Sequence, residues 1–231
     1  MAEELPVVFV PGLGCTARLF AHQIASLGER RCRVADHARH DAIGAIAESV
    51  LAEAPERFAL VGLSMGGYVA FEILRRAPDR VARLALLDTT AEPDTEEGRA
   101  RRRTLIAAAR KNKLGSIHQA TFARYVDLTR EGDAALEALV REMLFETGAP
   151  AFARQMTAIL TRPEQASVLP GLRCPTLVLV GENDLPTPPE HARRMAAAIP
   201  DARLVVLPGV GHLSAIEAPE AVSAELVAFL G

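Results

Sequence analysis

Residues 58–70 constrain the fold of this chain more than any other segment. They read FALVGLSMGGYVA: an apolar run typical of a buried strand, then G-x-S-x-G, then an alanine-rich run typical of a helix. A serine between strand and helix in this pattern stands at the apex of a sharp turn, with its hydroxyl exposed above the sheet. Gly62 and Gly66 flank Ser64 where strand and helix must pack closely. The segment predicts Ser64 as a nucleophile. The alternative is a structural glycine-rich turn with an incidental serine.

Short apolar runs alternate with alanine-rich helical stretches at both ends of the chain, which is typical of parallel βαβ units. We expect strands at 7–10, 33–35, 58–63, 82–87, 176–180 and 203–207. Helices are expected at 18–27, 43–54, directly after Ser64, at 188–198 and at 219–230. The pattern predicts an α/β fold: a mostly parallel six-stranded sheet flanked by helices, built from residues 1–90 and 164–231.

Residues 91–163 break this alternation. They contain no strand pattern and four successive helical patterns, at 95–111, 114–126, 133–146 and 150–160. A block of helices between two strands of a parallel sheet predicts a lid over the carboxyl ends of the strands, where open α/β sheets bind ligands. We therefore expect an inserted four-helix lid on one core domain.

Composition excludes several classes of protein. The formal net charge of −3 favours neither nucleic acid nor anionic membranes as partners. Cys15, Cys32 and Cys174 are odd in number and unpatterned, so they indicate neither a disulfide framework nor a metal site. The first residues lack a basic start and a long apolar run, and no stretch is long enough to span a bilayer. These features lead us to expect a cytoplasmic protein.

Partners for Ser64 follow in the order that an elbow nucleophile requires, serine, then acid, then histidine. Asp184 comes just after the strand expected at 176–180, and His212 lies in a glycine-bracketed turn after the last expected strand. A serine hydroxyl needs such a base, and the base needs an orienting carboxylate. Asp88, at the end of the strand expected at 82–87, is the rival acid.

An acyl-transfer site also needs two N–H donors for the developing oxyanion. We expect one from Met65, directly after the nucleophile, and the other from Leu13 in the loop Pro-Gly-Leu-Gly after the first strand. Cys15 in that loop has no matching histidine motif, which favours a small buried thiol over a nucleophile.

With these motifs the chain resembles the α/β-hydrolase superfamily over nearly its whole length. The P-G-L-G turn, the G-L-S-M-G-G elbow, the G-E-N-D acid loop and the G-V-G-H-L base loop stand in the family's order. Two departures matter. Pro11-Gly12 replaces the His-Gly of many relatives, which leaves the Leu13 donor in place. The sheet starts near residue 7, and residues 36–41 replace a longer loop, so we expect a minimal core and a site open on that side.

Two other clusters are set aside. His37, His40, Asp36 and Asp41 match no compact ligand spacing, so we expect no metal site. The arginine-rich stretch at 99–113 follows several acids and contains no aromatic residue, which favours a solvated lid helix over a nucleic-acid surface.

The resemblance implies a serine hydrolase that cleaves small-molecule carboxylic esters through an acyl-enzyme, without metal or cofactor. The alanine-rich lid, poor in large aromatic residues, favours a promiscuous carboxylesterase. Two alternatives stay open. One is a dedicated enol-lactone or C–C bond hydrolase, with Arg124 or Arg154 holding a substrate carboxylate. The other is a non-catalytic receptor of the same fold. Natural substrate and oligomeric state have no signal in the sequence.

Overall fold

The computed structural model describes residues 5–231. In that range one sheet contains six strands in the order β2-β1-β3-β4-β5-β6, and every neighbouring pair runs parallel. The strands are β1 (Val7–Val10), β2 (Cys32–Val34), β3 (Phe58–Leu63), β4 (Val81–Leu87), β5 (Thr176–Gly181) and β6 (Ala202–Leu207). The helices around them are α1 (Ala21–Leu27), α2 (Ile43–Glu53), α3 (Met65–Arg76), α8 (Pro189–Ala198), α9 (Ser214–Glu217) and α10 (Pro219–Leu230). The predicted α/β fold is confirmed.

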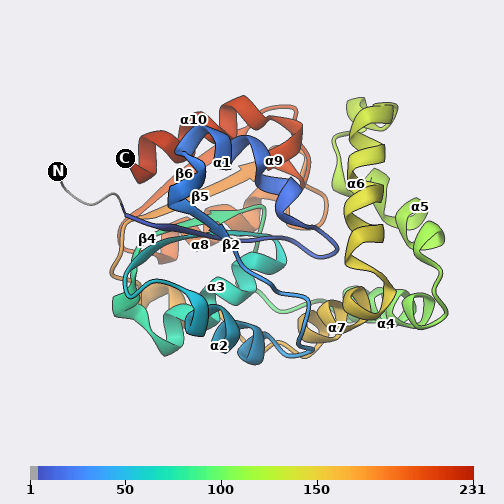
Figure 1. Cartoon of the computed structure of the whole chain (residues 1–231), viewed down its shortest axis with the longest axis horizontal. Coiled ribbons are helices and arrows are strands. Elements are labelled where there is room, and N and C mark those ends of the chain that lie inside the picture. Colours follow the sequence, from blue (N-terminus) through green and yellow to red (C-terminus); the bar gives the residue numbers. More distant parts are fainter. Residues whose placement is uncertain (1–4) are drawn as a thin grey trace.

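Helices cover both faces of the sheet (Figure 1). Successive strand residues point to opposite faces, so the core has two layers. Val8 and Leu60 face the layer that holds α2, α3 and α8, whereas Phe9 and Val61 face the layer that holds α10. Because both faces are buried there, strands β1, β3 and β5 read as nearly continuous apolar runs in the sequence, whereas the edge strands β2 and β6 are only partly buried.

The predicted boundaries agree with the observed strands to within one residue at either end. Two local features differ from expectation. The helix expected at 18–27 divides into a short 3₁₀ helix, Ala17–Phe20, and α1, because the backbone of Phe20 (φ −110°, ψ 16°) leaves the helical region. Helix α9 was not expected, and its four residues are too few to carry a periodic signal. Further 3₁₀ helices lie at Glu29–Arg31, Pro78–Arg80, Leu128–Arg130 and Ala166–Gly171.

Residues 91–163, called here the helical insert, contain four α-helices between β4 and β5. They are α4 (Glu96–Arg110), α5 (Leu114–Tyr125), α6 (Ala134–Thr147) and α7 (Ala149–Leu160). The side chains of Thr95 and Asp133 cap α4 and α6 by accepting backbone N–H groups of the first turn. The helices pack around a small apolar core that includes Ile106, Ile117 and Phe152.

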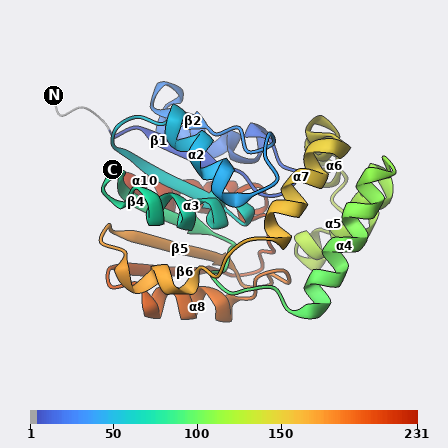
Figure 2. The ribbon, with the colours of Figure 1, turned by 90° about the horizontal axis from the view of Figure 1, so that it is seen from below.

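The helical insert gathers at one end of the sheet, apart from the helices that cover its faces (Figures 1 and 2). It is entered from the carboxyl end of β4, so it lies beside the edge where the strands end. That it serves as a lid inserted into one core domain remains a prediction. No helix between residues 5 and 231 combines the length and the apolar character that crossing a membrane requires.

Candidate active site

Ser64 stands in a strained turn between β3 and α3. Its backbone adopts φ 53° and ψ −112°, a conformation that non-glycine residues seldom adopt. The Ser64 N–H donates to the carbonyl of Leu87 (2.9 Å), and its own carbonyl accepts from the hydroxyl of Thr89 (2.8 Å). A Cβ on Gly66 would overlap the carbonyl oxygen of Val10, so only glycine fits there. The surrounding backbone thereby holds the turn and directs Ser64 beyond the end of the sheet.

The structure brings the three predicted side chains together in one chain of hydrogen bonds. The Ser64 Oγ lies 2.9 Å from Nε2 of His212, and Nδ1 of His212 lies 2.9 Å from both carboxylate oxygens of Asp184. Beside a carboxylate, Nδ1 carries the proton, which leaves Nε2 as the acceptor for the serine hydroxyl. The backbone N–H and hydroxyl of Thr187 donate to Asp184 at 2.8 and 2.7 Å and fix its orientation.

The loop that carries His212 is held by a buried carboxylate. Glu217 accepts from the backbone N–H groups of Asp127 (2.7 Å), Gly211 (3.2 Å) and Leu213 (3.0 Å). Burial raises the pKa of Glu217, while these backbone donors lower it. One side chain of α9 therefore joins the base loop to the end of α5.

Asp88, the rival acid, has other partners. Its carboxylate accepts from the N–H of Gly181 (3.1 Å) and from the N–H and hydroxyl of Ser214 (3.2 and 2.5 Å). No hydrogen bond joins it to His212 in residues 5–231. Complete burial, together with the charge of Asp184, raises the pKa of Asp88 well above its usual value. Its contacts tie β5 to the start of α9.

The electrostatics of His212 reflect two opposed effects. Burial alone would lower the pKa of this imidazole, because it disfavours the charged form. The charge of Asp184 and its hydrogen bond act the other way, and the resulting pKa lies above the usual value. The imidazole therefore binds a proton more readily than a free histidine does.

The loop expected to supply an oxyanion donor lies against Ser64. Gly12 and Leu13 line the same small cavity as the serine, and the Leu13 N–H has no hydrogen-bond acceptor among the described residues. Met65 is the first residue of α3, where backbone N–H groups lack helical partners. The carbonyl of Gly12 accepts a hydrogen bond from Nε2 of His37 (3.0 Å), which helps to hold the loop that contains Leu13 in place. Burial lowers the pKa of His37, which favours the neutral ring.

The thiol of Cys15 lies in the same loop and is buried. Burial raises its pKa to about 12, so it stays protonated at neutral pH. A protonated buried thiol is a poor nucleophile, in agreement with the expectation from sequence.

The flank expected to be open is in contact with the helical insert. Nε of Arg154 in α7 donates to the carbonyl of Ala38 (2.9 Å), and Gln155 accepts from the N–H of Gly14 (3.0 Å). Residues 36–41 thus contact α7 at this point, because Arg154 reaches across to the Ala38 carbonyl. Among the described residues, no group of three or more His, Cys, Asp or Glu side chains is arranged to hold a metal ion.

A cavity of about 60 Å³ lies over Ser64. Three side chains of the helical insert contribute to its lining: Arg102, Tyr125 and Ile159. The insert therefore borders the cavity beside Ser64, and the rest of its lining comes from the core.

Sequence reasoning missed several residues that shape the site. Thr187 follows Asp184 by three positions, a spacing at which a carboxylate commonly accepts from local backbone and hydroxyl donors, so that signal was available. Arg102 had none, because its place in the cavity depends on how the helical insert folds onto the core. The Glu217 contact with Asp127 depends on the same folding, although its other two contacts are local.

The chain has clear relatives among known proteins. The sequence model described as "Alpha/beta hydrolase family" matches residues 7–225 of the chain. The chain is similar to a pimeloyl-[acyl-carrier protein] methyl ester esterase of Chromobacterium violaceum, with 29% identity over 221 residues, which cover 89% of this chain and 86% of that protein.

Two solved structures are similar over nearly the whole chain. A thermophilic esterase from Thermogutta terrifontis, solved with malate bound, shares 31% identity at a TM-score of 0.89, covering 98% of this chain and 89% of that one. The enol-lactonase from Burkholderia xenovorans LB400 shares 27% identity at a TM-score of 0.86, covering 99% and 92%.

Proposed function

Because the chain belongs to the α/β-hydrolase family, we propose that it is a serine hydrolase that cleaves carboxylic esters through an acyl-enzyme. The observation that carries the proposal is the unbroken chain of hydrogen bonds from Ser64 through His212 to Asp184. This arrangement matches a nucleophile, its general base and the group that orients the base. The esterases among the similar proteins support the same chemistry.

In the proposed reaction, the Ser64 oxygen attacks the ester carbonyl carbon while Nε2 of His212 takes the hydroxyl proton. The N–H groups of Leu13 and Met65 stabilise the oxyanion. The C–O bond then breaks, and the imidazolium returns its proton to the departing alcohol. A water molecule, deprotonated by the same imidazole, attacks the acyl-enzyme, and the carboxylic acid leaves as Ser64 regains its proton. Asp184 stays ionised and stabilises the imidazolium in both halves.

The helical insert serves as a lid in this proposal, since Arg102, Tyr125 and Ile159 line the space above Ser64. The apolar part of the lining, which includes Leu63, Ile159 and Leu213, discriminates weakly between acyl groups, at about 1–3 kcal/mol per methylene. We therefore expect turnover of a broad range of small esters.

The experiment is hydrolysis of short p-nitrophenyl esters by the wild type and by Ser64→Ala. The variant is expected to fold normally and to lose activity by about 10⁴- to 10⁶-fold. A fluorophosphonate probe should label the wild type at Ser64 alone. Labelling at another residue, or turnover retained in the variant, would contradict the proposal. A folded wild type that neither hydrolyses esters nor reacts with the probe would support the receptor alternative.

Lactone hydrolysis is the second candidate, and the similarity to an enol-lactonase favours it. A lactone is a cyclic ester, so the same residues perform the reaction and the leaving alcohol stays attached to the acyl group. Assaying a set of lactones alongside linear esters separates the two, since kcat/KM reports which substrate the transition state fits better.

A further inference from the structure

The cavity over Ser64 adjoins a larger one of about 470 Å³ that is bordered by the helical insert. The two cavities share five lining residues: Tyr68, Arg102, Tyr125, Pro186 and Thr187. A substrate whose ester lies at Ser64 therefore has room to extend past Arg102 into the larger cavity. The residues that line the larger cavity determine which chemical groups are favoured in the part of the substrate that enters it.

The larger cavity carries more positive than negative charge. Its lining includes four arginines and two carboxylates, hence a formal balance of +2: Arg101, Arg102, Arg124 and Arg162 against Asp94 and Glu97. The whole chain, by contrast, has a formal net charge of −3. Positive charge is thus concentrated beside the candidate active site of a chain that is negative overall.

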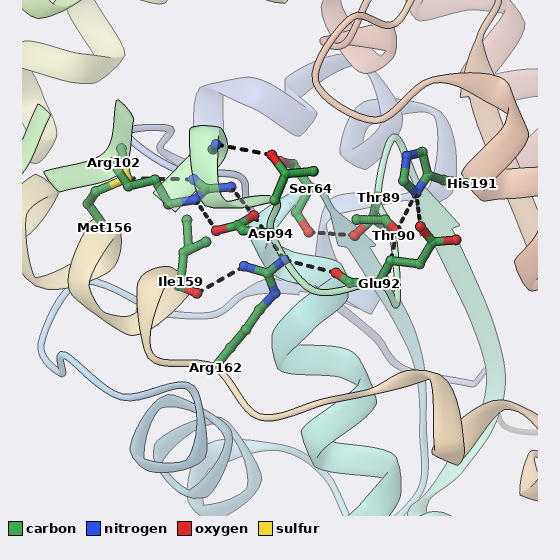
Figure 3. A network of polar contacts seen from close by, with 12 residues as sticks. Ser64, Thr89, Thr90, Glu92, Asp94, Arg102, Met156, Ile159, Arg162 and His191 are labelled. Carbon is green, nitrogen blue, oxygen red and sulfur yellow. Dashed lines mark hydrogen bonds and ion pairs between the residues drawn. The ribbon is translucent and has the colours of Figure 1, made fainter. Parts of the chain in front are cut away.

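Asp94 neutralises part of this charge. Arg102 binds both of its oxygens (2.6 and 3.1 Å), and Arg162 binds it at 3.0 Å (Figure 3). The remaining Arg102 nitrogen, Nη1, faces the Met156 sulfur at 3.6 Å, and a thioether is a weak acceptor. Arg102 therefore keeps donor capacity in a residue that both cavities share.

Arg124, in the last turn of α5, differs from the other three arginines. Arg101 pairs with Glu97, whereas Arg124 forms no ion pair or hydrogen bond with any described side chain, although it is half-buried. A guanidinium in such a place binds a carboxylate well, because its planar donors match the two oxygens.

We propose that the enzyme prefers esters that carry a carboxylate remote from the scissile bond, and that Arg124 and Arg102 bind this carboxylate in the larger cavity. The inference rests on the proposed function, since it requires an ester held at Ser64. Arg154, the other arginine considered from sequence, is engaged with the Ala38 carbonyl instead.

The test compares methyl half-esters of four- to nine-carbon dicarboxylic acids with neutral methyl esters of equal chain length. For the best-fitting length, kcat/KM should favour the half-ester by about 10- to 100-fold, the size of a hydrogen bond to a charged group. Arg124→Gln should remove about tenfold or more of this ratio, and Arg124→Lys should retain part of it. The matched control is Arg103→Gln, which lies outside the cavity, pairs with Glu96 and should keep the full ratio.

Binding without turnover provides a second readout. Calorimetry with Ser64→Ala should show tighter binding of the half-ester than of the neutral ester, and added salt should reduce that difference. Equal kcat/KM for the two series in a wild type that hydrolyses both would overturn this inference alone. A ratio that Arg124→Gln leaves unchanged would overturn it too. Failure to hydrolyse any ester, with no labelling of Ser64, would instead refute the proposed function.

Discussion

The carbonyl oxygen of Tyr125 accepts a hydrogen bond of 3.0 Å from the N–H of His212. Tyr125 ends α5 of the helical insert, and the two rings lie with centroids 5.6 Å apart. The segment that covers the site and the loop that carries the base are thus joined directly. In the proposed reaction, a displacement of α5 would therefore move His212 and alter the geometry of proton transfer as well as access to Ser64.

The first prediction concerns the acid. Asp184→Asn should lower kcat by about 10⁴-fold, because an asparagine no longer fixes the imidazole tautomer that leaves Nε2 free to accept. Asp88→Asn should cost less than about 100-fold, since Asp88 acts on His212 through its charge and through the loop it holds, and not through a hydrogen bond to the imidazole. The measurement is steady-state hydrolysis by both folded variants. The opposite order of effects would assign the acid to Asp88.

The second prediction concerns pH. The reaction needs a neutral imidazole, so kcat/KM should rise with pH as His212 loses its proton. Because the pKa of His212 is raised, the midpoint should lie above the ordinary histidine value of about 6.5. Residual activity of Asp184→Asn should show a lower midpoint, as the carboxylate that raises the pKa is gone while burial remains. A wild-type midpoint below about 6.5 would contradict this reading.

The third prediction concerns the elbow. Gly66→Ala should destabilise the fold by about 3 kcal/mol and abolish activity, because the added methyl group overlaps the Val10 carbonyl. Gly115→Ala is the matched control in α5, where a Cβ meets nothing within 4 Å. It should leave stability unchanged or raise it by up to about 1 kcal/mol. Urea unfolding of the two variants measures the difference.

The fourth prediction concerns the base loop. Glu217→Gln replaces one acceptor oxygen with a donor, so at least one of three backbone N–H groups loses its partner. Stability should fall by about 1–3 kcal/mol, the cost of a buried unpaired group. Activity should fall as well, because the loop no longer fixes His212. Unchanged kcat in a destabilised variant would show that Glu217 supports the fold alone.

The fifth prediction concerns the Asp94 network. Burial opposes ionisation of Asp94, but hydrogen bonds from Arg102 and Arg162 lower its pKa to about 2. Because the pKa of Asp94 is lower in the folded chain than the value of about 3.9 in the unfolded chain, its ionised carboxylate stabilises the fold. This contribution is complete at pH values above the unfolded-state pKa and is lost as the pH falls towards 2. Asp94→Asn should therefore lower the free energy of unfolding by about 3 kcal/mol at neutral pH.

Unfolding at several pH values tests this linkage. The stability difference between Asp94→Asn and the wild type should be constant above about pH 5 and should shrink below about pH 4. A difference that stays the same down to pH 3 would mean that the ionised carboxylate contributes nothing.

Local patterns predicted most of the fold, since strands β1, β3 and β5 are apolar runs that both layers bury. The order of Ser64, Asp184 and His212 was also readable, because each lies in a short motif after a strand. Glu217 and Arg102 were not readable. Besides its local partners Gly211 and Leu213, the Glu217 carboxylate accepts from a backbone group 90 positions away. Arg102 enters the cavity only once α4 has folded over the site. A local sequence pattern does not predict contacts between segments that are far apart in the chain.

The ion pair of Asp94 with Arg162 has a consequence for engineering. It joins positions 68 residues apart, at the points where the chain leaves the core before α4 and returns after α7. The two ends of the segment 95–161 are thus held together, so this segment is suited to exchange between relatives in chimaeric proteins. The exchange has one condition. A transplanted segment must place a backbone carbonyl where that of Tyr125 lies and a backbone N–H where that of Asp127 lies. Otherwise the recipient gains a new pocket, but the loop that carries His212 loses its contacts with the insert.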